Sequence, residues 1–433
     1  MGFGVFMPKM KIFRQIVIKS LIFIAAIAAM TGMLAAVSMI PKAQIRENVR
    51  ESAEFLCSDD PFPYAVEGIK GSCLDRYADA ILFNIIYSYD SREPFQSVMR
   101  SSYYFQSDRE ETENLLEAVT NDMAPNRQYL RYWHGSAVLL RPLLCIFTIR
   151  QIYLLNAVLL FALLLWFIIV SLKAKDYLLS IGMAVSMLLV RIWFVPFCLE
   201  YTWVFLIMSI ASLTAFKLGR KQNPEKLTTF LMLVGMVTNF FDFLTAETVT
   251  LVIPLLIILY LQKKEHGADR LVGLAVKGAA AWLAGYALTW VSKWLVAAVI
   301  LRENVMPYVS GHIAQRIGED LGIGTFRYLT GALTKNFGCL FPLGYGVIGI
   351  IGFVLILIVA AYPAFVYFKK DPEVRVIFIY AATGCIPLIR FLLLHNHSYL
   401  HFFFTYRALS STVFAAALLI GELIFGGKHE KNG

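Results

Sequence analysis

The stretch QIYLLNAVLLFALLLWFIIVSL, residues 151–172, decides the class of fold. It contains no charged side chain, and a helix of this length rises roughly 33 Å, enough to cross a hydrocarbon core of about 30 Å. Comparable apolar runs occupy residues 17–40, 177–196, 201–217, 227–243, 247–262, 271–292, 343–367, 374–394 and 402–425. The sequence therefore predicts an all-α, polytopic helical membrane protein with about ten transmembrane helices.

The composition excludes a soluble enzyme and a disordered chain. Hydrophobic residues make up 58% of the 433 residues and charged residues only 16%, whereas soluble domains carry about 25% charged residues. The net charge of +9 does not indicate a nucleic-acid partner, because Lys and Arg cluster beside the apolar runs. At those places they set topology and contact lipid head groups, so the expected partners include membrane lipids and no nucleic acid.

Basic clusters predict the orientation of the chain in the membrane. KAKD at 173–176 and KKEHGADR at 263–270 fall on the same side as the basic N-terminus. By the positive-inside rule we expect both termini of an integral plasma or inner membrane protein to be cytoplasmic. This parity requires that 136–150, which carries Arg141 and Pro142, forms a re-entrant or surface helix rather than a span.

Two large polar segments then lie on the outer face of a single multi-pass domain covering 1–433. The first extracytoplasmic loop is 41–135 and should contain amphipathic surface helices; the second is 293–342. Cys57 and Cys73 both lie in the first loop and would pair if it faced an oxidising compartment. The sequence leaves this pairing and the oligomeric state open.

The first candidate site is an acidic pair in the outer loop. Tyr77, Ile81 and Ile85 recur at helical spacing, and Asp75 and Asp79 are four residues apart, so both carboxylates should leave one side of a surface helix. Two close acids raise the pKa of one of them, which suits a general base or a cation site. A solvated polar face is the structural alternative. Of the two acidic residues, Asp79 is favoured for the catalytic role, because it precedes an apolar run.

The second candidate lies where the first loop returns to the membrane. The motif there is Arg131-Tyr132-Trp133-His134, followed by Arg141 in LRPLL. Arg131 and Arg141 are suited to binding a phosphate or pyrophosphate through charge-assisted hydrogen bonds. The aromatic residues would serve equally as interfacial anchors, and the arginines as snorkelling residues.

The remaining candidates are ionisable residues at the outer ends of spans, where burying a charge is costly: Arg191, Glu200, Asp242, Glu247, Arg390, His397 and Arg407. Each is either a substrate-binding residue or half of a structural pair. Three histidines within 395–401 form a weak metal pattern, so the metal ligands stay undetermined, with a divalent cation as one option.

The layout of residues 17–172 resembles the type C (GT-C) polytopic glycosyltransferases. In that family a large outer loop follows the first helix and contains an essential acid, and an aromatic turn leads into a Pro-Leu helix. Asp75 or Asp79 occupies the position of the acid, and Tyr132-Trp133-His134 followed by Arg141-Pro142-Leu143 is similar to the turn. The chain lacks an Asp-Glu dipeptide after the first helix.

The resemblance implies a membrane glycosyltransferase. Such an enzyme would move a sugar from a polyprenyl-phosphate-linked donor to a glycan, lipid or protein acceptor on the outer face. Asp79 or Asp75 would act as the base, and Arg131, Arg141, Arg390 and Arg407 would stabilise the leaving phosphate. The alternatives are a transporter or flippase of lipid-linked or anionic substrates, and a non-catalytic assembly protein.

Overall fold

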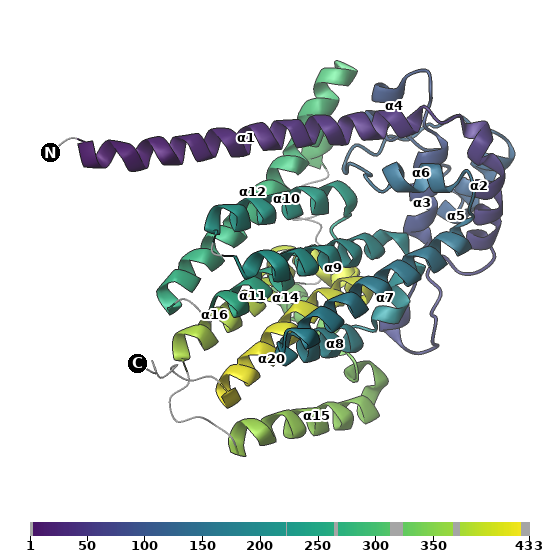
Figure 1. The fold of residues 1–433 in the computed structure, drawn as a ribbon. Helices are drawn as coiled ribbons and strands as arrows, with labels where there is room; N and C mark the ends of the chain where they lie inside the picture. Colours follow the sequence, from purple (N-terminus) through teal and green to yellow (C-terminus); the bar gives the residue numbers. More distant parts are fainter. Residues whose placement is uncertain (1–2, 222, 264–266, 312–323, 367–372, 426–433) are drawn as a thin grey trace.

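The protein is described here by a computed structural model that places residues 3–221, 223–263, 267–311, 324–366 and 373–425. All regular secondary structure in these residues is helical, apart from the isolated β-bridges Tyr64↔Cys73 and Tyr103↔Arg127. The all-α prediction is confirmed for the described residues (Figure 1).

The N-terminal part contains one long helix and several short ones. The elements are α1 (Phe3–Ser38), α2 (Lys42–Cys57), η1 (Lys70–Ser72), α3 (Arg76–Tyr87), α4 (Pro94–Arg100), α5 (Glu111–Thr120) and α6 (Ala137–Leu143). The remainder is a bundle of α7 (Ile149–Lys173), α8 (Tyr177–Leu189), η2 (Ile192–Phe197), α9 (Leu199–Gly219), α10 (Pro224–Phe241), α11 (Val249–Lys263), α12 (Ala268–Leu301), α14 (Thr325–Cys339), η3 (Leu343–Tyr345), α15 (Gly346–Val366), α16 (Val374–Gly384), α17 (Ile386–Leu393), α18 (His395–Leu400), α19 (Phe402–Thr405), η4 (Tyr406–Ala408) and α20 (Leu409–Phe425).

Seven helical stretches within the described residues are long and apolar enough to cross a membrane. They are Phe13–Ser38, Ile149–Lys173, Leu199–Gly219, Ala268–Leu301, Leu343–Tyr362, Val374–Leu393 and Phe402–Phe425. The predicted spans at 177–196 and 247–262 correspond to the shorter apolar helices α8 and α11, and the one at 227–243 to α10. The chain is thus a multi-pass helical protein with seven clear candidate spans.

The helix that contains the span predicted at 271–292 is longer than that span. It is α12, which continues to Leu301, so the predicted second loop begins with helical residues. Lys293 is tolerated inside the helix because it is fully buried and its ammonium group donates to the carbonyl oxygens of Val98 (3.1 Å) and Met99 (3.0 Å). Residues 312–323 of the predicted loop lie outside the described residues.

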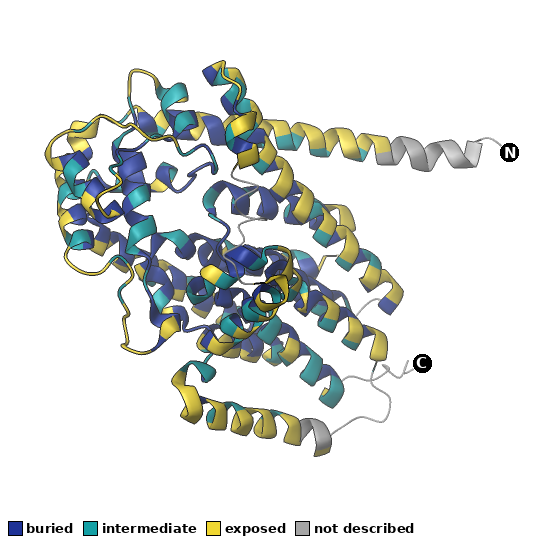
Figure 2. Ribbon diagram, turned by 180° about the vertical axis from the view of Figure 1, so that it is seen from behind, coloured by how far each residue is buried: buried dark blue, intermediate teal, exposed yellow. Residues whose placement is uncertain are grey.

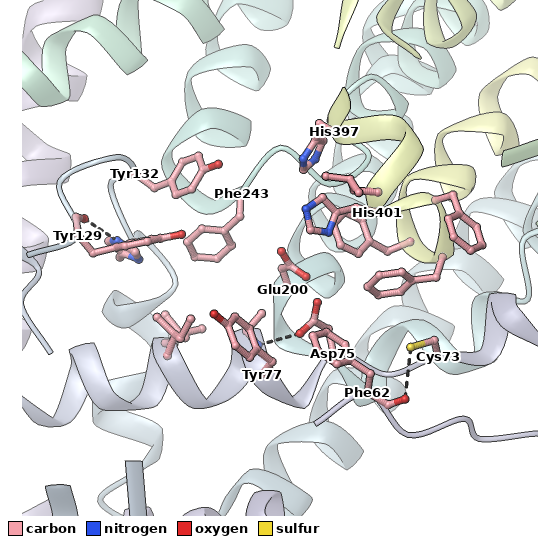
Figure 3. A pocket seen from close by; sticks show the side chains of 18 of the residues that line it. Phe62, Cys73, Asp75, Tyr77, Tyr129, Tyr132, Glu200, Phe243, His397 and His401 are labelled. Carbon is pink, nitrogen blue, oxygen red and sulfur yellow. Dashed lines mark hydrogen bonds between the residues drawn. The ribbon is translucent and has the colours of Figure 1, made fainter. Parts of the chain in front are cut away.

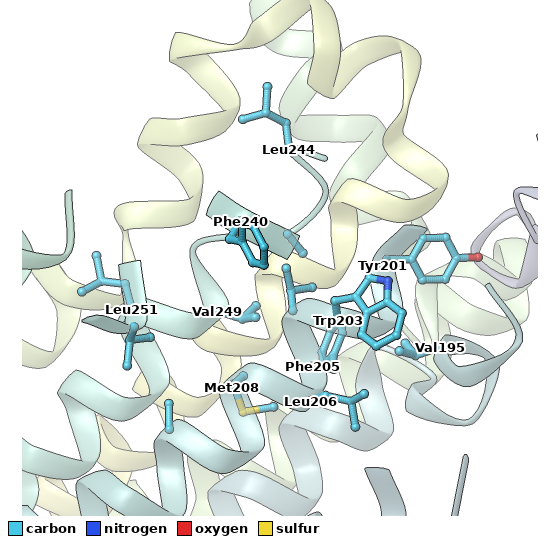
Figure 4. Packing of buried hydrophobic residues seen from close by; sticks show 14 of the residues in the cluster. Val195, Tyr201, Trp203, Phe205, Leu206, Met208, Phe240, Leu244, Val249 and Leu251 are labelled. Carbon is cyan, nitrogen blue, oxygen red and sulfur yellow. The ribbon is translucent and has the colours of Figure 1, made fainter. Parts of the chain in front are cut away.

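The bundle is held together by close helix packing around α9, α10 and α11. Figure 4 shows Trp203, Phe205 and Phe240 in this core. At the crossing of α10 and α12, a Cβ atom on Gly235 would overlap the carbonyl of Trp282. Glycine therefore allows the two backbones to touch, a common device between membrane helices. By contrast, α15 is almost entirely exposed and lies at the margin of the bundle (Figures 1 and 2).

The helices of the first loop gather at one end of the bundle. In Figure 1, α2, α3 and α5 lie at the right, whereas the start of α1 and the end of α20 lie at the left. The short helix predicted in 136–150 is present as α6, which at seven residues is too short to span a bilayer. Helix α3 packs against α2 and α5 and is buried on several sides, rather than lying on the surface as predicted.

Candidate functional site

A cavity of about 440 Å³ lies where the first-loop helices meet the ends of the bundle helices (Figure 3). Its walls come from the start of α3, the start of α9, the segment before α6, Phe243, and the short helices α18 and α19. Nine of its nineteen lining residues are phenylalanine or tyrosine: Phe62, Tyr64, Tyr77, Tyr129, Tyr132, Phe243, Phe402, Phe403 and Phe404. Its ionisable groups are Cys73, Asp75, His134, Glu200, His397 and His401, besides the tyrosines.

Asp75 and Glu200 form a carboxyl pair in the wall of this cavity. Asp75 is the N-cap of α3, since its Oδ1 accepts a hydrogen bond from the Ala78 N–H (2.8 Å). Its side chain shares a hydrogen bond with Glu200 in the first turn of α9, and Figure 3 shows the two carboxyl groups pointing toward one another. Burial raises the pKa of Asp75 to about 6, against the lowering effect of these hydrogen bonds.

Asp79 does not line the cavity. Its carboxyl group accepts hydrogen bonds from the Tyr153 hydroxyl (2.5 Å) and from the backbone N–H groups of Leu199 (2.9 Å) and Glu200 (3.2 Å). Burial raises its pKa to about 7. Both acids face the start of α9, as expected from their spacing: Asp79 joins α3 to the N-terminus of that helix, whereas Asp75 lies beside the Glu200 side chain and lines the cavity. Their placement does not support the preference for Asp79.

His134 and Tyr132 form part of the opposite wall. His134 Nε2 lies 3.2 Å from the carbonyl oxygen of Tyr129, whereas Nδ1 has no hydrogen-bond partner. Burial, together with the Lys293 ammonium, lowers the pKa of His134 to about 3, so its ring is neutral at physiological pH. With the proton on Nε2, Nδ1 is an acceptor for a ligand hydroxyl.

The turn that positions His134 depends on the following glycine. His134 has φ of 55°, and Gly135 donates its N–H to the carbonyl of Phe240 at 2.8 Å. A Cβ atom on Gly135 would overlap that carbonyl, so the turn can dock against the end of α10 only with glycine there.

His397 and His401 lie against each other on a third wall, with ring centroids 4.7 Å apart and the ring planes tilted by 47°. His397 Nε2 lies 2.8 Å from the carbonyl oxygen of Leu244, while His395 packs against Tyr328 outside the cavity. Among the described residues, no three His, Cys, Asp or Glu side chains come together as metal ligands. The histidine pattern at 395–401 therefore does not form a three-ligand metal site in the described chain.

The arginines expected to bind phosphate have protein partners instead. Arg141 is fully buried and donates to the carbonyl oxygens of Ile40, Ile86 and Tyr89. Arg407 is also fully buried; it donates to the Gly71 carbonyl (3.1 Å) and lies over the Tyr201 ring.

Arg131 and Trp133, the other two residues of the motif at 131–134, lie outside the cavity and contact neighbouring residues. Arg131 lies over the rings of Tyr129 and Tyr132. Trp133 is fully buried and donates its indole N–H to the Thr289 carbonyl (2.8 Å). Neither side chain lines the cavity.

Asp242 and Arg390 belong to a closed network around residues 242–247, which we call the Leu244 turn. Asp242 accepts from the N–H of Leu244 (2.9 Å) and from the hydroxyl of Thr245 (2.7 Å). Arg390 donates to the Glu247 carboxylate (2.8 Å), to the Leu244 carbonyl (2.6 Å) and to the hydroxyl group of Ser398. Arg390 is paired with Glu247, whereas Asp242 accepts hydrogen bonds within its own turn, and neither side chain lines the cavity.

The site residues predicted from the sequence therefore divide into two groups. The structure brings Asp75, Tyr132, His134 and His397 together around one cavity, and places Asp79, Arg131, Trp133, Arg141, Asp242, Arg390 and Arg407 outside it. Sequence reasoning did not single out Tyr77, Phe62 or the Phe402–Phe404 run as lining residues. It noted Glu200 only as a charge at a span end, because its proximity to Asp75 depends on tertiary packing.

All six cysteines are free in the structure, including Cys57 and Cys73. Cys73 lines the cavity, and burial raises its pKa to about 12, so its thiol is protonated at neutral pH. Cys57 lies on α2, near α5, rather than against Cys73.

Comparison with protein-family models, with curated proteins and with solved structures found no match for this chain. The function has to be argued from the cavity itself.

Proposed function

We propose that the protein is a membrane glycosyltransferase of GT-C type that transfers a sugar from a polyprenyl-phosphate-linked donor to an acceptor on the outer face. The observation that carries the proposal is the Asp75–Glu200 carboxyl pair, which is buried in an aromatic cavity formed by the first loop and the bundle ends. A carboxyl group whose pKa lies just below neutrality suits a general base.

The shape and lining of the cavity support a sugar as ligand. Its volume of about 440 Å³ lies within the usual range for small-molecule sites, which combine apolar walls with a few convergent polar groups. Aromatic rings such as Phe62 and Tyr77, stacked with centroids 5.6 Å apart, offer flat faces to the C–H side of a sugar ring. His134 and the two carboxyl groups supply acceptors for its hydroxyl groups.

The reaction follows from these groups. The acceptor hydroxyl oxygen forms a bond to the anomeric carbon, and the bond from that carbon to the phosphate oxygen breaks, leaving its electron pair on the lipid phosphate. The hydroxyl proton passes to the Asp75 carboxylate.

The phosphate requires a cationic position other than the arginines predicted from sequence. Lys70 and Lys335 both contact Phe402, whose ring lines the cavity; their ammonium groups lie 5.7 and 5.1 Å from its centroid. We assign the leaving phosphate to this edge of the cavity, where the lysines would stabilise its developing charge.

The proposal includes the membrane topology predicted from sequence. The shorter helices α8, α10 and α11 would complete ten spans in the plasma or inner membrane, with both termini cytoplasmic and the cavity at the outer face. A cavity at the end of the bundle suits a transferase better than a transporter or flippase, whose site is expected near the bilayer midplane.

The test is lipid-phosphate release by the purified protein in nanodiscs, measured over a panel of polyprenyl-phosphate sugars with and without acceptors. We expect release by the wild type and a loss of about 10²–10⁴-fold in Asp75→Asn, the usual contribution of a general base. Asparagine is as good an N-cap as aspartate, so α3 should keep its start.

Glu93→Gln is the matched control, because Glu93 is an exposed carboxylate in the same loop and its loss should leave release unchanged. No release from any donor, together with movement of those lipids across proteoliposomes, would favour the transporter. Full activity in Asp75→Asn would remove Asp75 from the mechanism.

A further inference from the structure

The charge of the cavity wall is unbalanced. It contains two carboxyl groups, Asp75 and Glu200, and within the described residues no lysine or arginine side chain lines it. Three cations outside the lining lie over wall rings: Lys70 and Lys335 at Phe402, and Arg131 at Tyr129 and Tyr132. His134, on the opposite wall, is neutral and supplies no positive charge.

The Asp75–Glu200 pair has no cationic partner for the one negative charge that it carries. The two carboxyl groups share a hydrogen bond and hence a proton, and within the described residues no lysine or arginine lines the wall beside them. The Oε2 atom of Glu200 is buried and has no hydrogen-bond partner in the protein, whereas the buried Glu247 is matched by Arg390. Buried charges in proteins are normally paired, and leaving one unpaired is costly. The missing positive charge is therefore one that a ligand would supply.

The aromatic walls specify which kind of cation fits. The rings of Phe62 and Tyr77 stack on each other beside Asp75, and His401 lies on the other side of the carboxyl pair (Figure 3). The His401 ring stacks with that of Phe404, with centroids 5.3 Å apart. Faces of aromatic rings attract organic ammonium groups, and such rings together with carboxylates form the recognised binding environment for amines. Hard metal ions prefer a shell of oxygen ligands, and no three metal-ligating side chains meet in the described chain.

We infer that the cavity binds an amino sugar with a free, protonated amine, whose ammonium group lies between the Asp75–Glu200 pair and the aromatic rings. The hydroxyl groups of the same sugar would reach His134 Nδ1, which has no protein partner. This inference rests on the proposed function in one respect only, that the cavity is the sugar site of the transferase. It names the substrate class: a sugar carrying a basic nitrogen, as donor or as acceptor.

The experiment compares three matched sugars on the full-length protein in nanodiscs. Glucosamine, glucose and N-acetylglucosamine share a ring and differ only at one substituent, and their binding is measured by quenching of tryptophan fluorescence and by calorimetry at pH 7, with EDTA present. We expect glucosamine to bind at least about tenfold more tightly than either neutral sugar, the effect of a partly desolvated cation–π and carboxylate contact. Equal binding of the three sugars would overturn the inference.

Two variants locate the effect. Glu200→Gln should weaken glucosamine severalfold and glucose less, because it removes one of the two carboxyl groups beside the ammonium group. Phe62→Leu, at the exposed edge of the cavity, should also weaken glucosamine severalfold. Glu93→Gln is again the matched control for a lost carboxylate. If magnesium chloride alone displaces glucosamine in buffer without EDTA at micromolar concentration, the carboxyl pair is a metal site and the inference fails.

The outcomes distinguish this inference from the proposed function. Transfer of neutral sugars without selective glucosamine binding would leave the transferase intact and refute the amine. Selective glucosamine binding without any lipid-phosphate release would support the amine and refute the transferase.

Discussion

The cavity and the Leu244 turn are two buried, charged regions that adjoin each other, and they differ in one respect. In the Leu244 turn the three nitrogens of the Arg390 guanidinium and the side chains of Asp242 and Glu247 all have protein partners. In the cavity wall, atoms of Glu200, His134 and Tyr132 have none. His397 belongs to both regions, since it lines the cavity and lies against the Leu244 carbonyl.

Buried charges therefore have different roles in the two regions. The Leu244 turn uses its charges to hold α17 against the segment between α10 and α11, so they stabilise the fold. The cavity leaves hydrogen-bonding capacity unused, which in a buried site indicates a ligand. Burial of a charge marks an important residue, whereas unsatisfied capacity next to a cavity marks a binding residue.

The largest expected effect on stability is in the Leu244 turn. Arg390→Met leaves Glu247 buried without its partner, and breaking a buried pair in this way costs about 3–5 kcal/mol. We expect a marked fall in the unfolding temperature, measured by tryptophan fluorescence in detergent.

The double variant Arg390→Met with Glu247→Met is the control for this effect. It should recover most of the lost stability because it leaves no uncompensated charge. A stable Arg390→Met protein that no longer releases lipid phosphate would break the comparison, because the Leu244 turn would then belong to the substrate site.

A smaller loss is expected at Asp79, which joins α3 to α9. Asp79→Ala leaves the Tyr153 hydroxyl and the N–H groups of Leu199 and Glu200 without an acceptor. Unpaired buried groups of this kind cost about 1–3 kcal/mol. The unfolding temperature should fall, while release per folded molecule should fall far less than in Asp75→Asn.

The outcome at Asp79 would also sharpen the assignment of the base. If Asp79→Ala unfolds at the wild-type temperature and abolishes release, then Asp79 and not Asp75 is the base, and the preference drawn from sequence was right.

The helical class of the fold follows from the sequence, because a long apolar run in a bilayer can satisfy all its backbone hydrogen bonds internally only as a helix. The run at 151–172 lies within α7, which begins at a Thr148–Gln151 capping box and ends at Lys173. Boundaries were less predictable. The predicted span ends just before Lys293, whereas the helix continues past it. The carbonyl oxygens of Val98 and Met99, which are distant in sequence, accept hydrogen bonds from the Lys293 ammonium group there.

The candidate site was predictable only in part, for a related reason. Residue type and position placed Asp75, Tyr132, His134 and His397 among the candidates, and all four line the cavity. The same reasoning placed Arg141 and Arg407 there, although backbone carbonyls satisfy both. Whether a buried guanidinium finds a carbonyl or a ligand depends on packing between distant segments, which periodicity and composition do not report.

The smallest effect concerns pH and uses one acid from each region. Burial raises the pKa of Asp75 to about 6 and that of Asp242 to about 7, but only Asp75 is a base in the proposed reaction. A base acts when deprotonated, so release should rise about tenfold per pH unit at pH well below 6 and level off above it.

Asp242→Asn separates the two acids in this profile. Asparagine can still accept from Thr245, so the variant should fold and keep its midpoint near pH 6. A midpoint near 7 that disappears in Asp242→Asn would instead assign the controlling proton to the Leu244 turn, and the distinction between a closed structural network and an open cavity wall would fail.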